Sequence, residues 1–517
     1  MSKVQAIIFA AVVACASSTV PAQSQAAPIV KTQNSDVQGV VGPQVYVFKG
    51  IPFAAPPVGN LRWREPQPAA SWQGVRRAST FGNACMQTPG LSAANGGDAG
   101  PLSEDCLYLN VWTPKLSPSA KLPVMVWIHG GAYIFGAGSL AIYDGESLAN
   151  RGVVFVNLNY RLAQLGFFAH PALEQESPGG PVNFGLLDQI AALEWVQQNI
   201  AQFGGDPHNV TIFGQSAGAK SVLALFASPL ARGLFRKGIA MSSYALPDAT
   251  RTKALEIGVR VADEVGLKGA NATAAELRAV PAAKFGELKG QGISLGPVPV
   301  VGDKVLPQSI QETFAARREA PLPLILGNVS DDSSVVVAFG VDPAQVIRNL
   351  RGAGILAKAL YPGVKDDQQL GRFVARDLIF TSPVRALADS HSKLAPTYRY
   401  YFDYTAVKAR PRFPHGVGHG AEIIYFLDTG DLSPDMQSYF SQPDRDYARH
   451  ASDYLLEFAR SGRPASAGSP PWPSHDARND RTMQFDHTVS AQPNFMKARL
   501  NVFIRGSKLL APILNRK

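Results

Sequence analysis

Residues 210–227 read VTIFGQSAGAKSVLALFA, and this stretch decides how the rest of the chain is interpreted. A run of β-branched and aromatic residues (VTIF) leads at once into a serine between two glycines. A helix-forming run (AKSVLALFA) follows and ends at Ser228-Pro229. A strand, a sharp turn and a helix in this order push a serine hydroxyl out at the edge of a sheet, and small neighbours relieve the crowding. The pattern predicts that Ser216 is a nucleophile.

The same G-x-S-x-G spacing occurs a second time, around Ser294 in GISLG. Polar residues (KGQ) precede that serine, so no buried strand leads into it. Pro297 and Pro299 follow, and proline disfavours the start of a helix there. We therefore expect Ser216, and not Ser294, to be the reactive serine.

Other short apolar runs predict further strands, and continuous runs of this length are typical of strands buried on both faces of a parallel sheet. A helical pattern, with apolar residues three and four apart, extends from Leu186 to Phe203 and ends at Gly204-Gly205. Strand, helix and strand in sequence indicate a right-handed crossover and an α/β fold. The runs are residues 124–128 (VMVWI), 153–158 (VVFVNL), 210–213 (VTIF) and 322–326 (LPLIL).

The composition is typical of a globular protein: 517 residues, 46% hydrophobic and 17% charged. No linker or charge block divides the middle of the chain, so we predict one domain over residues 27–517. The formal net charge of +9 is modest for this length. Clusters such as residues 232–237 lack the density of basic side chains that a nucleic-acid site needs, so no nucleic-acid partner is expected.

The first residues have the pattern of an export signal. A lysine at position 3 precedes an apolar run from about Ile7 to Ala16, and the small-residue site SQA follows at 24–26. Residues 1–26 are therefore predicted to be a signal peptide, and the mature protein to be soluble and periplasmic or secreted. The apolar run is too short for stable membrane insertion. Lipidation at Cys15, in the box VVAC, is the alternative interpretation.

The chain has three cysteines: Cys15, Cys85 and Cys106. If Cys15 leaves with the signal, the remaining two are expected to pair in an oxidising compartment. The chain has no C-x-x-C and no clustered His/Cys spacing, so we expect neither a metal nor another cofactor.

A reactive serine needs a base, usually histidine, that a carboxylate holds. In sheets of this kind the order along the chain is serine, acid, histidine. His419 lies in the glycine-rich segment GVGHGAE, after an aromatic strand predicted at 397–404, and can reach the sheet edge. His415 is interpreted as a surface loop residue.

Two candidates exist for the acid, because run 322–326 leads into GNVSDD. Either Asp331 or Asp332 could orient His419. Donors for a negative oxygen are expected where run 124–128 leads into His129-Gly130-Gly131-Ala132. Together with the amide of Ala217, backbone N–H groups there could stabilise a tetrahedral intermediate.

With these pieces in order, the chain resembles the type-B carboxylesterase family, which includes the cholinesterases and bacterial p-nitrobenzyl esterases. The resemblance extends from about residue 35 to the C-terminus. It implies an α/β-hydrolase fold, with a large mostly parallel central sheet flanked by helices and with inserted helical and loop segments forming a gorge. It also implies ester hydrolysis through an acyl-enzyme. The motifs are GIPFAAPPVGNLRWREPQP (50–68), SEDCLYLNV (103–111), VWIHGGAY (126–133), NYRLAQLGF (159–167), NFGLLDQIAALEWVQQNIAQFGGDPHNVTIFGQSAG (183–218) and GHGAEI (418–423).

Carried over to this sequence, the resemblance implies a catalytic triad. The family has an Asp-Glu pair that falls on Asp331-Asp332 of this sequence. Asp332 therefore takes the acid position, where most members have Glu. Because Asp is shorter by one methylene, the backbone must approach His419 more closely. The implied residues are Ser216 (nucleophile), His419 (base), Asp332 (acid), and Gly131, Ala132 and Ala217 (oxyanion hole).

The resemblance also implies structural roles. Cys85 and Cys106 match the family's first disulfide, and Glu422 matches a residue lining the base of the gorge. A plain charge at a helix start is the alternative interpretation of Glu422. Two matched ion pairs, assigned to folding, are Arg62 with Glu104 and Arg161 with Asp188.

Three departures from the cholinesterases bear on the substrate. Loop 86–105 has no aromatic residue, so the cation–π partner of a quaternary ammonium is missing. Gln215 stands where cholinesterases have Glu, and the acyl-pocket stretch Ile293-Ser294-Leu295 is aliphatic. The predicted pocket residues are Gln215, Glu422, Ile293 and Leu295.

These observations predict a serine carboxylesterase that hydrolyses neutral, apolar small-molecule esters and that acts poorly on choline esters. The alternative is a non-catalytic, cholinesterase-like binding or adhesion protein. The intact Ser216, His419 and glycine-rich donor loop argue against that alternative.

Overall fold

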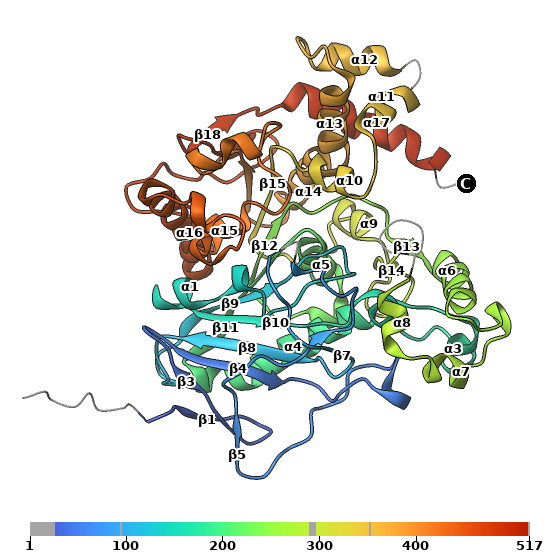
Figure 1. Cartoon of the computed structure of the whole chain (residues 1–517). Helices are drawn as coiled ribbons and strands as arrows, with labels where there is room; N and C mark the ends of the chain where they lie inside the picture. The colour runs from blue at the N-terminus through green and yellow to red at the C-terminus, as the bar shows by residue number, and fades with distance from the viewer. Residues whose placement is uncertain (1–25, 94–95, 289–295, 351–352, 515–517) are drawn as a thin grey trace, which may run out of the picture.

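The computed structural model of the chain describes residues 26–93, 96–288, 296–350 and 353–514, and an eleven-stranded β-sheet lies at its centre (Figure 1). Of the predicted signal peptide, all residues but Ala26 lie outside the described residues, so export and lipidation at Cys15 stay predictions. Within the described segments, no helix has both the length and the apolar character that a membrane crossing requires.

The sheet is parallel from β10 (Val154–Leu158) to β17 (Arg481–Phe485), and antiparallel strands flank this part on both sides. This mixed, mostly parallel arrangement confirms the predicted α/β class. From one edge to the other the strands are β18 (Ser490–Pro493), β17, β16 (Thr397–Phe402), β15 (Leu324–Val329), β12 (Lys237–Met241), β11 (Gly205–Gln215), β9 (Leu122–Ile128), β10, β8 (Tyr108–Thr113), β4 (Tyr46–Pro52) and β3 (Val40–Val41).

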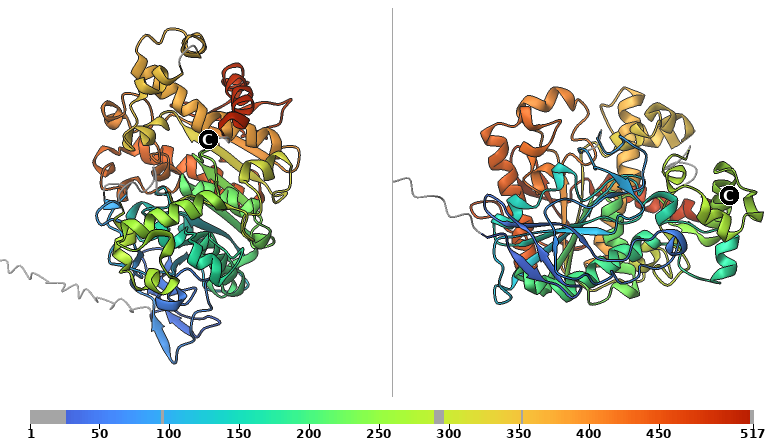
Figure 2. Two further views of the ribbon diagram at one scale, coloured as in Figure 1. Left: turned by 90° about the vertical axis from the view of Figure 1, so that its right-hand side faces the viewer. Right: turned by 60° about the horizontal axis from the view of Figure 1, so that its bottom comes forward.

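Helices surround the sheet, and the order of its strands along the chain follows their position across it, except that β9 and β10 are exchanged. The left view of Figure 2 shows the N-terminal strands (blue) and the C-terminal segments (orange and red) at opposite ends of the molecule. The α-helices are α1 (Glu146–Asn150), α2 (Ala163–Gly166), α3 (Pro171–Glu176), α4 (Phe184–Asn199), α5 (Ala217–Ala227), α6 (Arg251–Glu264), α7 (Ala274–Ala279), α8 (Ala282–Gly286), α9 (Ile310–Ala315), α10 (Ser333–Ala338), α11 (Pro343–Asn349), α12 (Ala353–Leu360), α13 (Asp367–Arg376), α14 (Ser382–His391), α15 (Ile423–Phe426), α16 (Gln442–Ser461) and α17 (Lys497–Leu514).

Successive side chains of β9 enter two different apolar clusters, so both faces of the sheet are buried. Val124, Val126 and Ile128 join the cluster that contains residues of α4 and α5. Met125 and Trp127 join the cluster that contains residues of α16. Because side chains of a strand alternate between faces, a strand covered on both sides needs an unbroken apolar run, as VMVWI provides.

The predicted elements exist, with shifted ends. The helix predicted from Leu186 to Phe203 is α4 and the 3₁₀ turn Ile200–Phe203, which ends at Gly204 in a left-handed conformation. The strand predicted at 322–326 is shifted to β15, because Pro323 has no N–H to donate to the sheet. It continues through Val329, which pairs with Phe402 of β16.

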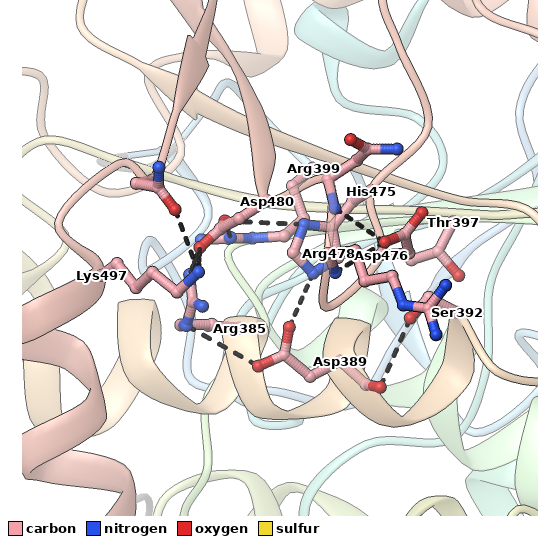
Figure 3. Close-up of polar contacts among 12 residues, drawn as sticks. Arg385, Asp389, Ser392, Thr397, Arg399, His475, Asp476, Arg478, Asp480 and Lys497 are labelled. Carbon is pink, nitrogen blue, oxygen red and sulfur yellow. Dashed lines mark hydrogen bonds and ion pairs between the residues drawn. The ribbon is translucent and has the colours of Figure 1, made fainter.

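A buried group of charges fastens the C-terminal elements to the sheet (Figure 3). Asp480, just before β17, accepts from Arg399 of β16 at 3.1 Å and lies 2.7 Å from Nη1 of Arg385 of α14. All three side chains are at most 3% exposed. The Nζ of Lys497, in α17, lies 3.6 Å from Asp480. Burial, with the positive charge of Arg385 nearby, lowers the pKa of Arg399 to about 10.

Asp480→Asn should lower the free energy of unfolding by about 3–5 kcal/mol, because it leaves two buried guanidinium groups without their shared counter-charge. Urea unfolding followed by circular dichroism measures the change. Asp431→Asn is the control, since it breaks the exposed pair with Arg445, and exposed ion pairs contribute little to stability. Equal losses in the two variants would contradict the assignment.

Candidate active site

Ser216 lies on the sharp turn between β11 and α5. Its backbone has a positive φ of 56° with ψ −121°, and its N–H donates to the carbonyl of Met241 in the neighbouring strand β12. Only glycine fits at the two flanking positions. A Cβ at Gly214 would lie 2.5 Å from the Ile128 oxygen, and a Cβ at Gly218 would lie 2.0 Å from the same oxygen. The turn therefore holds the serine in a conformation that non-glycine residues rarely adopt.

Three side chains that are far apart in the sequence form one hydrogen-bonded chain at this turn. The Ser216 hydroxyl lies 2.8 Å from Nε2 of His419, and Nδ1 of the same imidazole lies 2.7 Å from Oδ1 of Asp332. Asp332 is fully buried, and the other two are less than a tenth exposed. The ionised carboxylate can only accept, so the Nδ1–H donates to it and Nε2 is left to accept from the serine.

The side chains of the adjacent acids Asp331 and Asp332 point in different directions. The second oxygen of Asp332 accepts from the Val329 N–H at 2.9 Å, so this carboxylate is held from both sides. Asp331 faces away from His419. It accepts from the Ser333 hydroxyl and pairs with Arg372 at 3.1 Å, and burial raises the pKa of Asp331.

The segment that carries the acid and the segment that carries the histidine are joined along their backbones. Asp331 forms a parallel β-bridge with Gly418, and its N–H donates to the Val417 carbonyl at 2.8 Å. The hydroxyl of Ser330 accepts from the Val417 N–H at 2.7 Å, and that of Ser334 accepts from the His419 N–H at 2.8 Å. This close approach lets the short aspartate reach the imidazole.

Ser330 and Ser334 were not singled out from the sequence. A serine two residues from an acid is common in loops, and nothing in one sequence shows that it faces a segment some 85 positions later. The two contacts depend on the β-bridge, which forms only when the whole fold brings these segments together.

The loop after β9 places backbone donors next to the serine. The N–H groups of Gly131, Ala132 and Ala217 have no acceptor among the residues that the structure describes. Gly131 has φ 101°, and a Cβ there would lie 2.1 Å from the Phe135 oxygen, so only glycine allows this turn. Unpaired amides beside a nucleophile can accept the negative oxygen of a tetrahedral intermediate.

His129, at the start of this loop, is completely buried. Its ring stacks on Tyr160 with centroids 4.4 Å apart, and its Nδ1 lies 2.8 Å from the carbonyl of Gly130. Burial lowers the pKa of His129 to about 4. The ring is therefore neutral near pH 7, and it acts as an uncharged support under the donor loop.

Of the four predicted pocket residues, two can be placed. The side-chain amide of Gln215 lies 3.2 Å from Nε2 of His419. Glu422 is fully buried behind the site, where the Ser242 hydroxyl donates to it at 2.9 Å. Burial and the charge of Asp332 raise the pKa of Glu422. Ile293 and Leu295, like Ser294, lie outside the described residues.

The structure adds an aromatic wall to the site. The ring of Phe380 lies 5.4 Å from the imidazole of His419, and Tyr244 lies edge-on to Phe380 at 6.5 Å. His415 is exposed on the surface, as predicted. In the part of the chain that the structure describes, no three His, Cys, Asp or Glu side chains gather as metal ligands would.

The predicted structural pairs are present. Cys85 and Cys106 form a disulfide with Cα atoms 4.9 Å apart. The two ion pairs are Arg62–Glu104 at 2.5 Å and Arg161–Asp188 at 2.7 Å.

The chain is similar to known proteins over most of its length. A model of the carboxylesterase family matches residues 26–355 and 364–503. Fumonisin B1 esterase from Sphingopyxis macrogoltabida is 36% identical over 490 residues, covering 89% of this chain and 87% of that protein. Para-nitrobenzyl esterase from Bacillus subtilis is 35% identical, covering 90% and 96%. A solved carboxylesterase from Geobacillus stearothermophilus superimposes with a TM-score of 0.80 at 30% identity, covering 92% of this chain and 99% of that one.

Proposed function

The chain belongs to the carboxylesterase family and is a carboxylic ester hydrolase, and from this premise we propose that Ser216, His419 and Asp332 hydrolyse neutral, apolar esters through an acyl-enzyme. The observation that carries the proposal is the hydrogen-bonded chain from the serine through the imidazole to the buried carboxylate, next to amides that have no acceptor in the described structure.

In the first half of the reaction the Ser216 oxygen attacks the ester carbonyl carbon while its proton passes to Nε2 of His419. The negative oxygen of the tetrahedral intermediate lies at the amides of Gly131, Ala132 and Ala217. Collapse breaks the bond to the alcohol, which leaves with the proton from the imidazole. Asp332 stabilises the imidazolium and is not itself protonated.

Water then enters in place of the alcohol. His419 removes its proton as the water oxygen attacks the acyl carbon, and the second intermediate uses the same amides. The carboxylic acid leaves, the serine recovers its proton, and the site returns to its starting state. The same imidazole therefore serves as base and as acid in each half of the cycle.

Two observations support neutral substrates. Gln215 is uncharged, and its side chain lies at the imidazole, where a glutamate would attract a cation. The loop closed by the disulfide has no aromatic residue from 86 to 105, so no ring from this loop can hold a quaternary ammonium.

A matched pair of substrates tests this specificity. Butyrylthiocholine should have a kcat/KM about tenfold or more below that of 3,3-dimethylbutyl thiobutyrate, in which carbon replaces the charged nitrogen. The quaternary ammonium must leave water without a ring or a carboxylate that compensates for its lost hydration, and each 1.36 kcal/mol of that cost is a factor of about ten. Release of the thiol measures both reactions in one assay. Equal efficiency, or a preference for the choline ester, would refute the neutral pocket.

A further inference from the structure

The loop closed by the disulfide contacts the donor loop through a buried amide side chain, that of Gln87, which is 2% exposed. Its Nε2 donates to the carbonyl of Gly136 at 3.0 Å, and its Oε1 accepts from the N–H of Gly136 at 2.9 Å. The amide therefore pairs with both backbone groups of a single residue, as a neighbouring β-strand would.

The remaining hydrogen-bonding capacity of this amide is also used. Nε2 donates a second bond to the Cys85 carbonyl at 3.0 Å, and Oε1 accepts a second bond from the Ser92 hydroxyl at 2.6 Å. All four positions of the amide are filled, and Ser92 itself lies 3.3 Å from the Gly136 N–H. A buried amide with every partner in place has one orientation only.

Gly136 ends the turn that begins at Gly131 and that carries the donor amides of Gly131 and Ala132. It has φ 114°, and a Cβ there would lie 2.4 Å from Nδ1 of His129 and 2.9 Å from the Gly130 oxygen. Within the turn, the N–H groups of Ile134 and Phe135 both donate to the Gly131 carbonyl. A shift at Gly136 therefore passes directly to the residues whose amides lie beside Ser216.

We propose that Gln87 is a positioning residue for the oxyanion donors, and that the disulfide-closed loop holds these amides in place through it. The inference rests on the proposed function of Gly131 and Ala132. Gln87 does not touch the substrate. Its role is to fix the backbone of the turn before the reaction begins, so that the donors need not move when charge develops.

This role predicts a specific kinetic effect. Gln87→Leu keeps the size of the side chain and removes its hydrogen bonds to Gly136. Loss of one oxyanion donor costs about 10²–10³ in kcat, and a displaced donor costs less, so we expect kcat for p-nitrophenyl butyrate to fall about 10–100-fold. KM should change less than about threefold, because the ground-state ester does not need the amides in their final positions.

A second measurement separates positioning from loss of structure. A trifluoromethyl ketone forms a charged adduct with the serine, so its inhibition constant should rise in proportion to the fall in kcat/KM. A competitive inhibitor that forms no adduct, such as the corresponding amide, should bind Gln87→Leu as it binds the wild type. Thr88→Val is the control: it removes one hydrogen bond from the same loop, but to Gly286 instead of the donor turn.

Ser92→Ala removes the second partner of Oε1 and the longer contact with the Gly136 N–H, but it keeps the paired bonds between Gln87 and Gly136. It should therefore give a smaller fall of about 3–10-fold, and it keeps the test decisive if Gln87→Leu does not fold. A Gln87→Leu protein with unchanged kcat and unchanged ketone binding would overturn the inference. An equal fall in Thr88→Val would also overturn it. Wild-type chain that neither hydrolyses the ester nor reacts at Ser216 would instead overturn the proposed function.

Discussion

Ser216→Ala should lower kcat for ester hydrolysis by about 10⁵-fold or more, because the variant has no oxygen to form the acyl-enzyme. The residual rate comes from the donor amides and from substrate binding alone. Hydrolysis of p-nitrophenyl butyrate under saturating conditions measures the change. The melting temperature should stay close to that of the wild type, because the hydroxyl hydrogen bonds to His419 and the turn is held by backbone contacts.

The chain supplies its own control for this experiment. Ser294 has the same G-x-S-x-G spacing but neither a strand before it nor a helix-forming run after it. Ser294→Ala should therefore still form the acyl-enzyme and keep kcat within about tenfold of the wild type, although the residue belongs to the stretch matched to the acyl pocket. A Ser216→Ala protein that retains most of the activity, or a Ser294→Ala protein that loses it, would show that the strand–turn–helix argument selects the wrong serine.

Asp332→Asn should lower kcat about 10⁴-fold, an effect that arises from the tautomer of His419. One oxygen of Asp332 accepts from the Val329 N–H, so the asparagine carbonyl will occupy that position. Its NH₂ group then faces Nδ1 of the imidazole, which must become an acceptor. Nε2 consequently carries the hydrogen and cannot take the proton of Ser216. The pH profile of kcat/KM measures the remaining base activity.

Asp331→Asn is the matched control for this substitution. It makes the same chemical change one residue away, in a side chain that contacts Ser333 and Arg372 instead of the imidazole. We expect kcat to fall less than about tenfold. If Asp331→Asn lowered kcat more than Asp332→Asn, the acid would be Asp331. The contact between Asp332 and His419 would then not be the one used in the reaction.

The fold could be predicted from the sequence where the hydrophobic pattern is compatible with one type of element only. VMVWI is an unbroken apolar run, VTIF is interrupted only by a β-branched threonine, and both form strands buried on both faces. The strand ends were less predictable, because they depend on partners: β15 continues through polar Asn328 as its backbone pairs with β16. β12 (KGIAM) was not singled out, since a short run with a lysine and a glycine has no distinctive pattern.

The residues of the candidate site also differ in how far the local sequence alone indicates them. A local motif is enough to indicate Ser216, because its neighbours along the chain make the turn. The choice between Asp331 and Asp332 depends on which carboxylate faces a segment 87 residues later, and only the resemblance to a family indicated it beforehand. Gln87 was missed, because its partner Gly136 is 49 residues away and a lone glutamine carries no signal of its own.

The central claim is that Ser216 is the nucleophile that takes the acyl group, and covalent trapping tests it most directly. We predict that a fluorophosphonate probe modifies the wild-type chain once, and that tandem mass spectrometry locates the adduct on Ser216. Absence of an adduct on an intact, folded chain would favour the non-catalytic binding protein. An adduct on a different serine would contradict the account, even if the protein hydrolyses esters.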